Sequence, residues 1–228
     1  MEKKRQIAAV LILLALIGVI AYRHSTGKDL EKYEASFFDV FDTQTQIIGY
    51  ASSKEQFSEQ MSLIKDKFQY YNDLYDIYHD YEGMNNIKTI NDNAGIQPVK
   101  VDEEIIELLK LGITMDEKTD GNMNIAMGSV LSIWHDYREA GSEDPYSAEL
   151  PPMDELERAA EHTDIHDIVI DEEASTVYLT DPDMSLDVGS IGKGYAVQKV
   201  AEYAKNELGI QYMLFSVGGN VCAIGGHP

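Results

Sequence analysis

The stretch LDVGSIGKGYAVQKVAEYAKNELGI, residues 186–210, opens with Asp187, three glycines and Lys193 and continues with the periodicity of a helix. Apolar residues recur at helical spacing after the glycines, which predicts a helix from about Gly192 to Leu208, with Gly209 as the C′ residue that follows it. A strand ending at Leu186 is expected to precede it. The stretch therefore predicts a strand-loop-helix unit with a loop rich in glycine.

Two interpretations of this loop remain open from its spacing alone. A helix N-terminus carries partial positive charge, so the loop and Lys193 can cradle an anion, while Asp187 and Ser190 offer oxygens to Mg²⁺ or to a ligand hydroxyl. Alternatively, the glycines only permit a tight turn, Asp187 caps the helix and Lys193 is solvated. The glycines follow neither the GxxxxGK[ST] nor the GxGxxG pattern, so the spacing does not choose between the two.

Strands and helices alternate irregularly along the rest of the chain, which predicts an α+β fold with mixed sheets and packed helices. A second helix is expected after Asp102, and a hairpin over residues 167–181. Residues 86–101 are expected to form a loop, and residues 125–134 are ambiguous between strand and helix. A long helix is expected where apolar residues recur at spacings of three and four: Phe57, Met61, Ile64, Phe68, Tyr71, Tyr75 and Tyr78.

A short helix is expected over residues 153–162, and it brings His162 into an i, i+4 relation with His166. Two histidines at this spacing can bind zinc when they share a helix face. No third ligand accompanies them in the sequence, so we expect solvated histidines here.

Charge excludes one class of partner. The 228 residues carry a formal net charge of −22. Such a surface repels nucleic acid, so we expect no nucleic-acid binding. The same charge makes a lysine at a glycine loop informative, because an anionic ligand would need local cations or a metal.

The N-terminus has the pattern of an export signal. Three cations precede an apolar run from Ile7 to Tyr22, which predicts that residues 1–23 are a signal peptide or an uncleaved signal anchor. The remainder is then expected at the extracytoplasmic face of the cell membrane. Residues 24–36 are expected to be a polar linker, followed by one domain over residues 37–228.

Four motifs in a fixed order resemble the ApbE family of flavin transferases. They are FDVFDTQTQIIGY, which resembles the family's opening strand; INDNAG, which resembles its N-x-x-x-G loop; TDGNMNIAMGSVLSIWHDYR; and LDVGSIGKGYAVQKV, which is followed by a strand and GGN. The resemblance covers residues 37–228. It implies an ApbE-like α+β fold and a transferase that moves FMN from FAD to a Ser or Thr hydroxyl of an acceptor protein, releasing AMP.

The resemblance also implies roles for particular residues. Asp187 and Lys193 match positions that contact the FAD nucleotide, and Ser190 matches a position that contributes to Mg²⁺ binding. Further matches to positions that contact the cofactor are Phe41, Tyr78 (with Tyr81 as the alternative), Asn122, Met123 and Asn124. No catalytic residue is implied.

Two departures from the family pattern qualify this expectation. Asn124 stands where many members carry Asp, which replaces a carboxylate by an amide. The family's C-terminal portion supplies the carboxylates that hold most of the magnesium, and residues 37–228 contain none of it. Since Mg²⁺ needs several oxygen ligands, we expect a C-terminally incomplete domain with weak or absent transfer.

The functional expectation therefore keeps alternatives. The first is an Mg²⁺-dependent FAD:protein FMN transferase whose acceptor is a subunit of a membrane redox complex. The second is a catalytically incomplete flavin-binding protein tethered to the membrane. The third is a membrane-tethered interaction domain in which the motifs are only structural.

Overall fold

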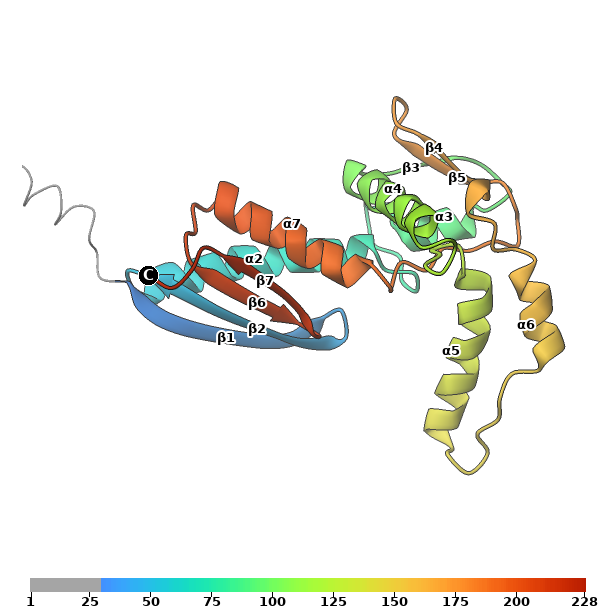
Figure 1. The fold of residues 1–228 in the computed structure, drawn as a ribbon, viewed down its shortest axis with the longest axis horizontal. Helices are drawn as coiled ribbons and strands as arrows, with labels where there is room; N and C mark the ends of the chain where they lie inside the picture. The colour runs from blue at the N-terminus through green and yellow to red at the C-terminus, as the bar shows by residue number, and fades with distance from the viewer. Residues whose placement is uncertain (1–29) are drawn as a thin grey trace, which may run out of the picture.

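The computed structural model describes residues 30–228, which form two antiparallel sheets and the helices packed on them (Figure 1). The larger sheet has the strand order β1-β2-β6-β7. The α+β class is confirmed, and every strand pair in the described part of the chain is antiparallel. The bounds of these strands are Glu31–Val40 for β1, Thr43–Ala51 for β2, Met213–Val217 for β6 and Asn220–Ile224 for β7.

The stretch FDVFDTQTQIIGY, which resembles a single opening strand, contributes to two strands, because a turn at Phe41 and Asp42 separates β1 from β2. Strand β1 also begins earlier than the sequence indicates. The polar residues 31–36, predicted as part of a linker, pair with β2 in a continuous ladder. Phe41 and Asp42 connect the two strands, and both have positive φ, 53° and 48°. Two successive left-handed residues match the right-handed twist of a hairpin, so this turn fixes where the Phe41 side chain lies.

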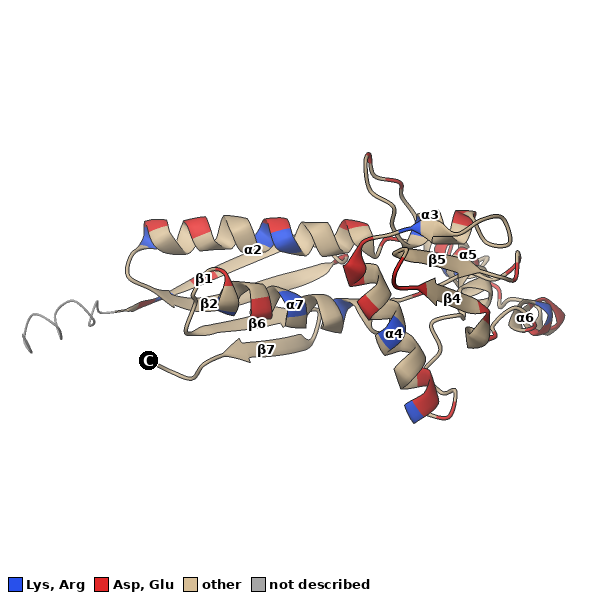
Figure 2. Ribbon diagram, turned by 90° about the horizontal axis from the view of Figure 1, so that it is seen from above, with Lys and Arg blue, Asp and Glu red and all other residues tan. Residues whose placement is uncertain are grey.

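Helix α2, Lys54–Leu74, packs on one face of the larger sheet beside α7, Gly192–Asn206 (Figures 1 and 2). The Ser53 side chain accepts a hydrogen bond from the backbone N–H of Gln56, which caps the first turn of α2. The predicted apolar stripe is confirmed as the buried face of α2, but the helix ends before Tyr78. That residue is instead in the following loop, with 52% of its surface exposed.

The smaller sheet has the order β3-β5-β4. Its β4–β5 hairpin is the one that the sequence predicts. The helix predicted after Asp102 is also confirmed, although the Asp102 carboxylate accepts from the Tyr70 hydroxyl, 3.1 Å away, and does not cap the helix. The bounds here are Val99–Lys100 for β3, Glu103–Lys118 for α4, Ile168–Asp171 for β4 and Thr176–Leu179 for β5.

The loop predicted over residues 86–101 is partly wrong, because α3 forms at Ile87–Asp92. The Asn86 side chain accepts from the backbone N–H of Thr89, and the Thr89 hydroxyl oxygen accepts from the backbone N–H of Asn86. This reciprocal capping box starts a helix in a segment whose Asn, Gly and Pro content favours a loop.

Helices α5, Gly128–Glu143, and α6, Met153–Ala160, project together from the smaller sheet (Figure 1). The ambiguous segment before Trp134 is thus helical from Gly128 onward. We call residues 128–160 the α5–α6 arm.

None of the helices within residues 30–228 is long and apolar enough to cross a membrane. The signal or anchor predicted for residues 1–23 lies outside the described residues.

Candidate functional site

The glycine-rich motif enters helix α7 from an extended segment, not from a strand. The predicted strand ending at Leu186 is wrong, because this segment pairs with side chains and loops instead of a sheet. Asn91 binds both backbone groups of Leu186: its Oδ1 accepts from the N–H at 2.7 Å, and its Nδ2 donates to the carbonyl at 3.0 Å. The backbone N–H of Asp187 donates to the Ile125 carbonyl at 2.9 Å.

The INDNAG motif thereby acquires a structural explanation. Its Asn91 fixes the residue before Asp187. Its Gly95 has a φ of +68°, and a Cβ there would lie 2.5 Å from the Pro182 Cβ. Both ends of this motif therefore hold the segment that leads into the loop before α7.

Replacing Asn91 with alanine is expected to lower the free energy of unfolding by about 1–3 kcal/mol, because two backbone groups of a buried leucine lose their partner. Urea denaturation followed by circular dichroism measures this. Asn85→Ala is the control, because exposed Asn85 makes a single bond, to the Lys100 carbonyl. Equal stability of Asn91→Ala and the parent chain would show that these two hydrogen bonds do not stabilise the fold.

A cavity of about 540 Å³ lies where this loop meets the β1–β2 turn and the residues after α2. Four of the predicted site residues line it, although they come from distant parts of the sequence: Phe41, Tyr78, Asp187 and Lys193. The cavity therefore gathers half of the predicted set. Its size and mixed polar and apolar walls suit part of a nucleotide.

Lys193 brings positive charge to this cavity from the first turn of α7. Its side chain is half-buried, and its Nζ donates to the Phe41 carbonyl oxygen at 3.5 Å. No ion pair joins Lys193 to a carboxylate within residues 30–228. Its charge and the helix N-terminus therefore both remain available to an anion.

Asp187 is organised by its own loop. Its Oδ1 accepts from the backbone N–H of Gly189 at 2.8 Å, so it closes the turn before α7 and does not cap the helix. The second carboxylate oxygen makes no hydrogen bond within the described residues. Asp187 can therefore accept from a ligand hydroxyl or amine.

Asp76 lines the cavity and holds its neighbouring side chains through hydrogen bonds, a role that the sequence does not indicate. Its carboxylate accepts from the Tyr81 hydroxyl at 2.7 Å, the His79 Nδ1 at 2.9 Å and the backbone N–H of Tyr78 at 2.6 Å. Burial alone would raise the pKa of Asp76, but these hydrogen bonds lower it below its ordinary value. Asp76 thus stays ionised and fixes the loop that carries Tyr78.

Both tyrosines that the sequence offered line the cavity, with different roles. Tyr81 is held by Asp76, and burial together with that bond raises the pKa of its hydroxyl. Tyr78 has a more exposed ring, and burial followed by the nearby Asp187 charge raises its pKa. Tyr78 is therefore the one with a ring face free for a ligand.

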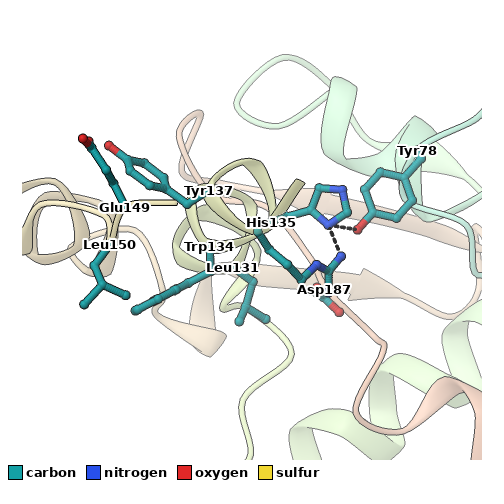
Figure 3. Close-up of a pocket in the computed structure, with 9 residues that line it drawn as sticks. Tyr78, Leu131, Trp134, His135, Tyr137, Glu149, Leu150 and Asp187 are labelled. Atoms are coloured by element: carbon teal, nitrogen blue, oxygen red, sulfur yellow. Dashed lines mark hydrogen bonds between the residues drawn. The ribbon is translucent and has the colours of Figure 1, made fainter. Parts of the chain in front are cut away.

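A second cavity of about 470 Å³ adjoins the first along α5 and shares Tyr78, Arg138 and Asp187 with it. Figure 3 shows its lining residues, which include Leu131, Trp134, His135 and Leu150. The Tyr78 and His135 rings stack with centroids 5.0 Å apart. Arg138 and His135 are further residues that sequence reasoning missed, although HDYR, residues 135–138, sits inside a motif it had singled out.

The remaining predicted residues do not line either cavity. The Asn124 side chain is engaged with backbone, donating to the Thr163 carbonyl at 2.9 Å and accepting from the N–H of Ala126 at 2.7 Å. The Asn122 Nδ2 donates to the Thr119 carbonyl at 2.6 Å. Met123 contacts Ser190, whose hydroxyl lies 3.7 Å from the methionine sulfur.

Ser190 alone does not fit a magnesium site. It offers one neutral oxygen, whereas Mg²⁺ in proteins is usually bound by carboxylates together with phosphates. Across residues 30–228, three His, Cys, Asp or Glu side chains converge closely enough for a metal ion only at His162, Asp181 and Asp183. A magnesium ion at Ser190 would need oxygens from a ligand or another part of the protein.

The predicted relation between His162 and His166 is also different in the structure. Helix α6 ends at Ala160, so the two histidines do not share a helix face. Instead, the Nδ1 of His162 lies 2.7 Å from the Asp181 carboxylate. This contact raises the pKa of His162. The pKa of Asp181 is lowered, mainly by the hydrogen bond from the Asp183 backbone N–H and secondly by the one from His162.

The His162–Asp181 pair predicts a pH dependence of stability. The contribution of His162 to stability is fully present below its unfolded pKa of ~6.5 and is lost as pH rises through its raised folded pKa. The contribution of Asp181 is present above its unfolded pKa of ~3.9 and is lost as pH falls through its lowered folded pKa. Thermal melting should therefore show that His162→Gln costs more at about pH 5.5 than at about pH 8.5. His166→Gln, which leaves the pair intact, is the control. A cost independent of pH would contradict the pairing.

The two sheets, the entry into α7 and the paired cavities define an α+β protein with a site suited to an anionic nucleotide. The ApbE family model matches residues 41–228. The chain belongs to the ApbE family.

Curated relatives of the chain carry the name of a flavin transferase. The chain is 25% identical over 186 residues to the FAD:protein FMN transferase of Klebsiella pneumoniae (strain 342), covering 82% of this chain and 56% of the relative. It is 24% identical over 159 residues to that of Escherichia coli (strain K12), covering 68% and 44%. The chain thus spans about half the length of these curated relatives.

The fold is likewise that of solved family structures. The ApbE protein of Thermotoga maritima aligns with a TM-score of 0.71 at 24% identity, over 86% of this chain and 60% of that one. The flavin transferase ApbE of Vibrio cholerae aligns with a TM-score of 0.70 at 19% identity, over 87% and 60%. The predicted ApbE-like fold is confirmed.

Proposed function

We propose that this chain binds FAD in the paired cavities and acts in the transfer of FMN from FAD to a Ser or Thr hydroxyl of an acceptor protein. One observation carries the proposal: Phe41, Tyr78, Asp187 and Lys193, which the family resemblance assigns to FAD, meet around one cavity. The name FAD:protein FMN transferase, carried by the relatives, supports the reaction.

The proposed reaction is a phosphoryl transfer. The acceptor oxygen attacks the phosphorus on the flavin side of the diphosphate and its proton is released to water. The bond from that phosphorus to the bridging oxygen breaks, and the electron pair leaves with AMP. Lys193 and the α7 N-terminus would offset the negative charge on the phosphate oxygens, which is where this class of reaction needs stabilisation. Asp187 would orient the nucleotide by accepting a hydrogen bond, and the Tyr78 ring would contact a flat part of it.

A magnesium ion is part of the proposal only if the bound ligand supplies some of its oxygen ligands. Ser190 supplies a single hydroxyl, so the phosphate oxygens of FAD would provide further ligands. Bound there, the ion would neutralise phosphate charge. The residues described here would hold the nucleotide and position the diphosphate.

The acceptor and the location are further parts of the proposal. We infer an acceptor subunit of a membrane redox complex and a site at the extracytoplasmic face of the cell membrane. The apolar run Ile7–Tyr22 after three cations supports both, since it would bring the domain to that surface.

Lys193→Ala is expected to weaken FAD binding about tenfold, the effect of one charge-assisted hydrogen bond to phosphate. Titration of the full chain followed by flavin fluorescence measures the Kd. Lys199→Ala is the matched control, because Lys199 lies on the same helix but binds Glu107 at 2.7 Å. An unchanged Kd for Lys193→Ala would mean that Lys193 is only solvated.

A second candidate function is flavin binding without transfer, and the single oxygen at Ser190 favours it. Incubation of the full chain with FAD, Mg²⁺ and a threonine-containing acceptor, followed by intact mass measurement, separates the two. An FMN increment on the acceptor supports transfer. Retained FAD with no increment supports the binding protein, and no retained FAD contradicts both.

A further inference from the structure

Arg138 is a cation in the paired cavities to which the family resemblance assigns no role. It lies on α5 and lines both cavities, together with Asp187 and Tyr78. The other arginine of residues 30–228, Arg158, is paired with Asp154 at 3.2 Å on the same helix. Arg138 has no ion pair with a carboxylate in the described part of the chain.

The contacts of His135 determine how Arg138 is held. The Nη2 of Arg138 lies 2.6 Å from His135 Nδ1, and the Tyr78 hydroxyl lies 3.4 Å from the same nitrogen. A guanidinium group can only donate, so Nδ1 must be the unprotonated acceptor. The proton of the neutral ring is then on Nε2, which donates to Glu139 at 3.0 Å.

This arrangement leaves the arginine at the cavity wall without a direct carboxylate partner among the described residues. Its partner is a neutral imidazole nitrogen, which is a weaker partner for guanidinium than an oxyanion that can accept two parallel N–H bonds. The surrounding protein has a net charge of −22, which opposes the entry of any anion. Two cations face one cavity from different helices, Lys193 on α7 and Arg138 on α5. They offer an anion charge-assisted hydrogen bonds among the carboxylates of Asp42, Asp76 and Asp187 that line the same cavity.

We propose that Arg138 is a second phosphate-binding group of this site, held by His135 until a nucleotide diphosphate binds and then transferred to its oxygens. The proposal rests on the proposed function for the identity of the dinucleotide. Transfer of Arg138 to the phosphate leaves His135 Nδ1 free to accept from the Tyr78 hydroxyl alone. The ligand would thus be clamped between the α5–α6 arm and the α7 N-terminus.

The test is the Kd of FAD for the full chain and its variants at about 50 and 300 mM salt, since screening weakens a contact between charges. Arg138→Ala should weaken binding about tenfold at low salt and reduce its salt dependence, and Arg138→Lys should recover part of the loss. Arg158→Ala, which removes the paired arginine, should change neither. Because Arg138 is exposed, circular dichroism is expected to show an unchanged fold for its variants.

Two results would overturn the inference. One is an unchanged Kd for Arg138→Ala in a chain that binds FAD and loses affinity with Lys193→Ala. The other is a weakened Kd with unaltered salt dependence, which would show that the side chain only packs. Failure of the parent chain to bind FAD would instead remove the proposed function and this inference together.

Discussion

Replacing Phe68 with alanine is expected to lower the free energy of unfolding by about 3–5 kcal/mol. Phe68 lies on the buried face of α2 and has no exposed surface. Its ring centroid is 6.3 Å from that of Phe37 on β1 and 6.2 Å from that of Phe215 on β6. Truncation would leave a cavity where the helix packs against two strands that are far apart in sequence.

Urea denaturation followed by circular dichroism measures this loss. Leu63→Ala is the matched control on the same helix, because Leu63 is 45% exposed and its truncation removes little buried surface. A loss below about 1 kcal/mol for Phe68→Ala would show that α2 does not depend on this contact.

Gly128→Ala should destabilise the protein and also weaken ligand binding. A Cβ at Gly128 would lie 2.5 Å from the carbonyl oxygen of Ser185, a backbone atom that cannot move aside independently. The clash is expected to cost about 1–3 kcal/mol. Since Ser185 is two residues before Asp187, the displaced segment should also raise the Kd for FAD.

The sign of the stability change caused by Gly128→Ala identifies its origin. Alanine favours a helix over glycine by about 1 kcal/mol, so a net loss must come from the close approach to Ser185. Urea denaturation and FAD titration provide the two measurements. Gly226→Ala, at a position with open space around it, is the control. Increased stability of Gly128→Ala with normal binding would contradict the prediction.

Local patterns were sufficient for the elements that bury one regular face. The stripe through Phe57 and Phe68 predicts α2, whereas the end predicted for α7 at Leu208 lies beyond the observed end at Asn206. The first residues of β1, EKYEAS, do not predict a strand because they are polar and become a strand only through pairing with β2. Helix α3 was missed because its capping box involves threonine at the position where glutamate is the usual signal.

In the site, too, motifs predict some residues, whereas others depend on packing between distant segments. Phe41 and Lys193 could be proposed from motifs, and the structure places the lysine against the phenylalanine carbonyl. Arg138 could not be ranked above other surface charges, because only the packing of α5 brings it beside Asp187. Asn124 could not be distinguished from a ligand contact, because its side chain is occupied by backbone groups distant in sequence.

The position of Trp134 has a practical consequence for studying the protein. It is the only tryptophan in the chain, is 43% exposed, and lines one of the paired cavities in which we propose that FAD binds. Indole emission overlaps the absorption of an oxidised flavin, so a flavin bound beside α5 would accept energy from this one side chain. If FAD binds there as proposed, quenching of the Trp134 emission would follow its binding without any label.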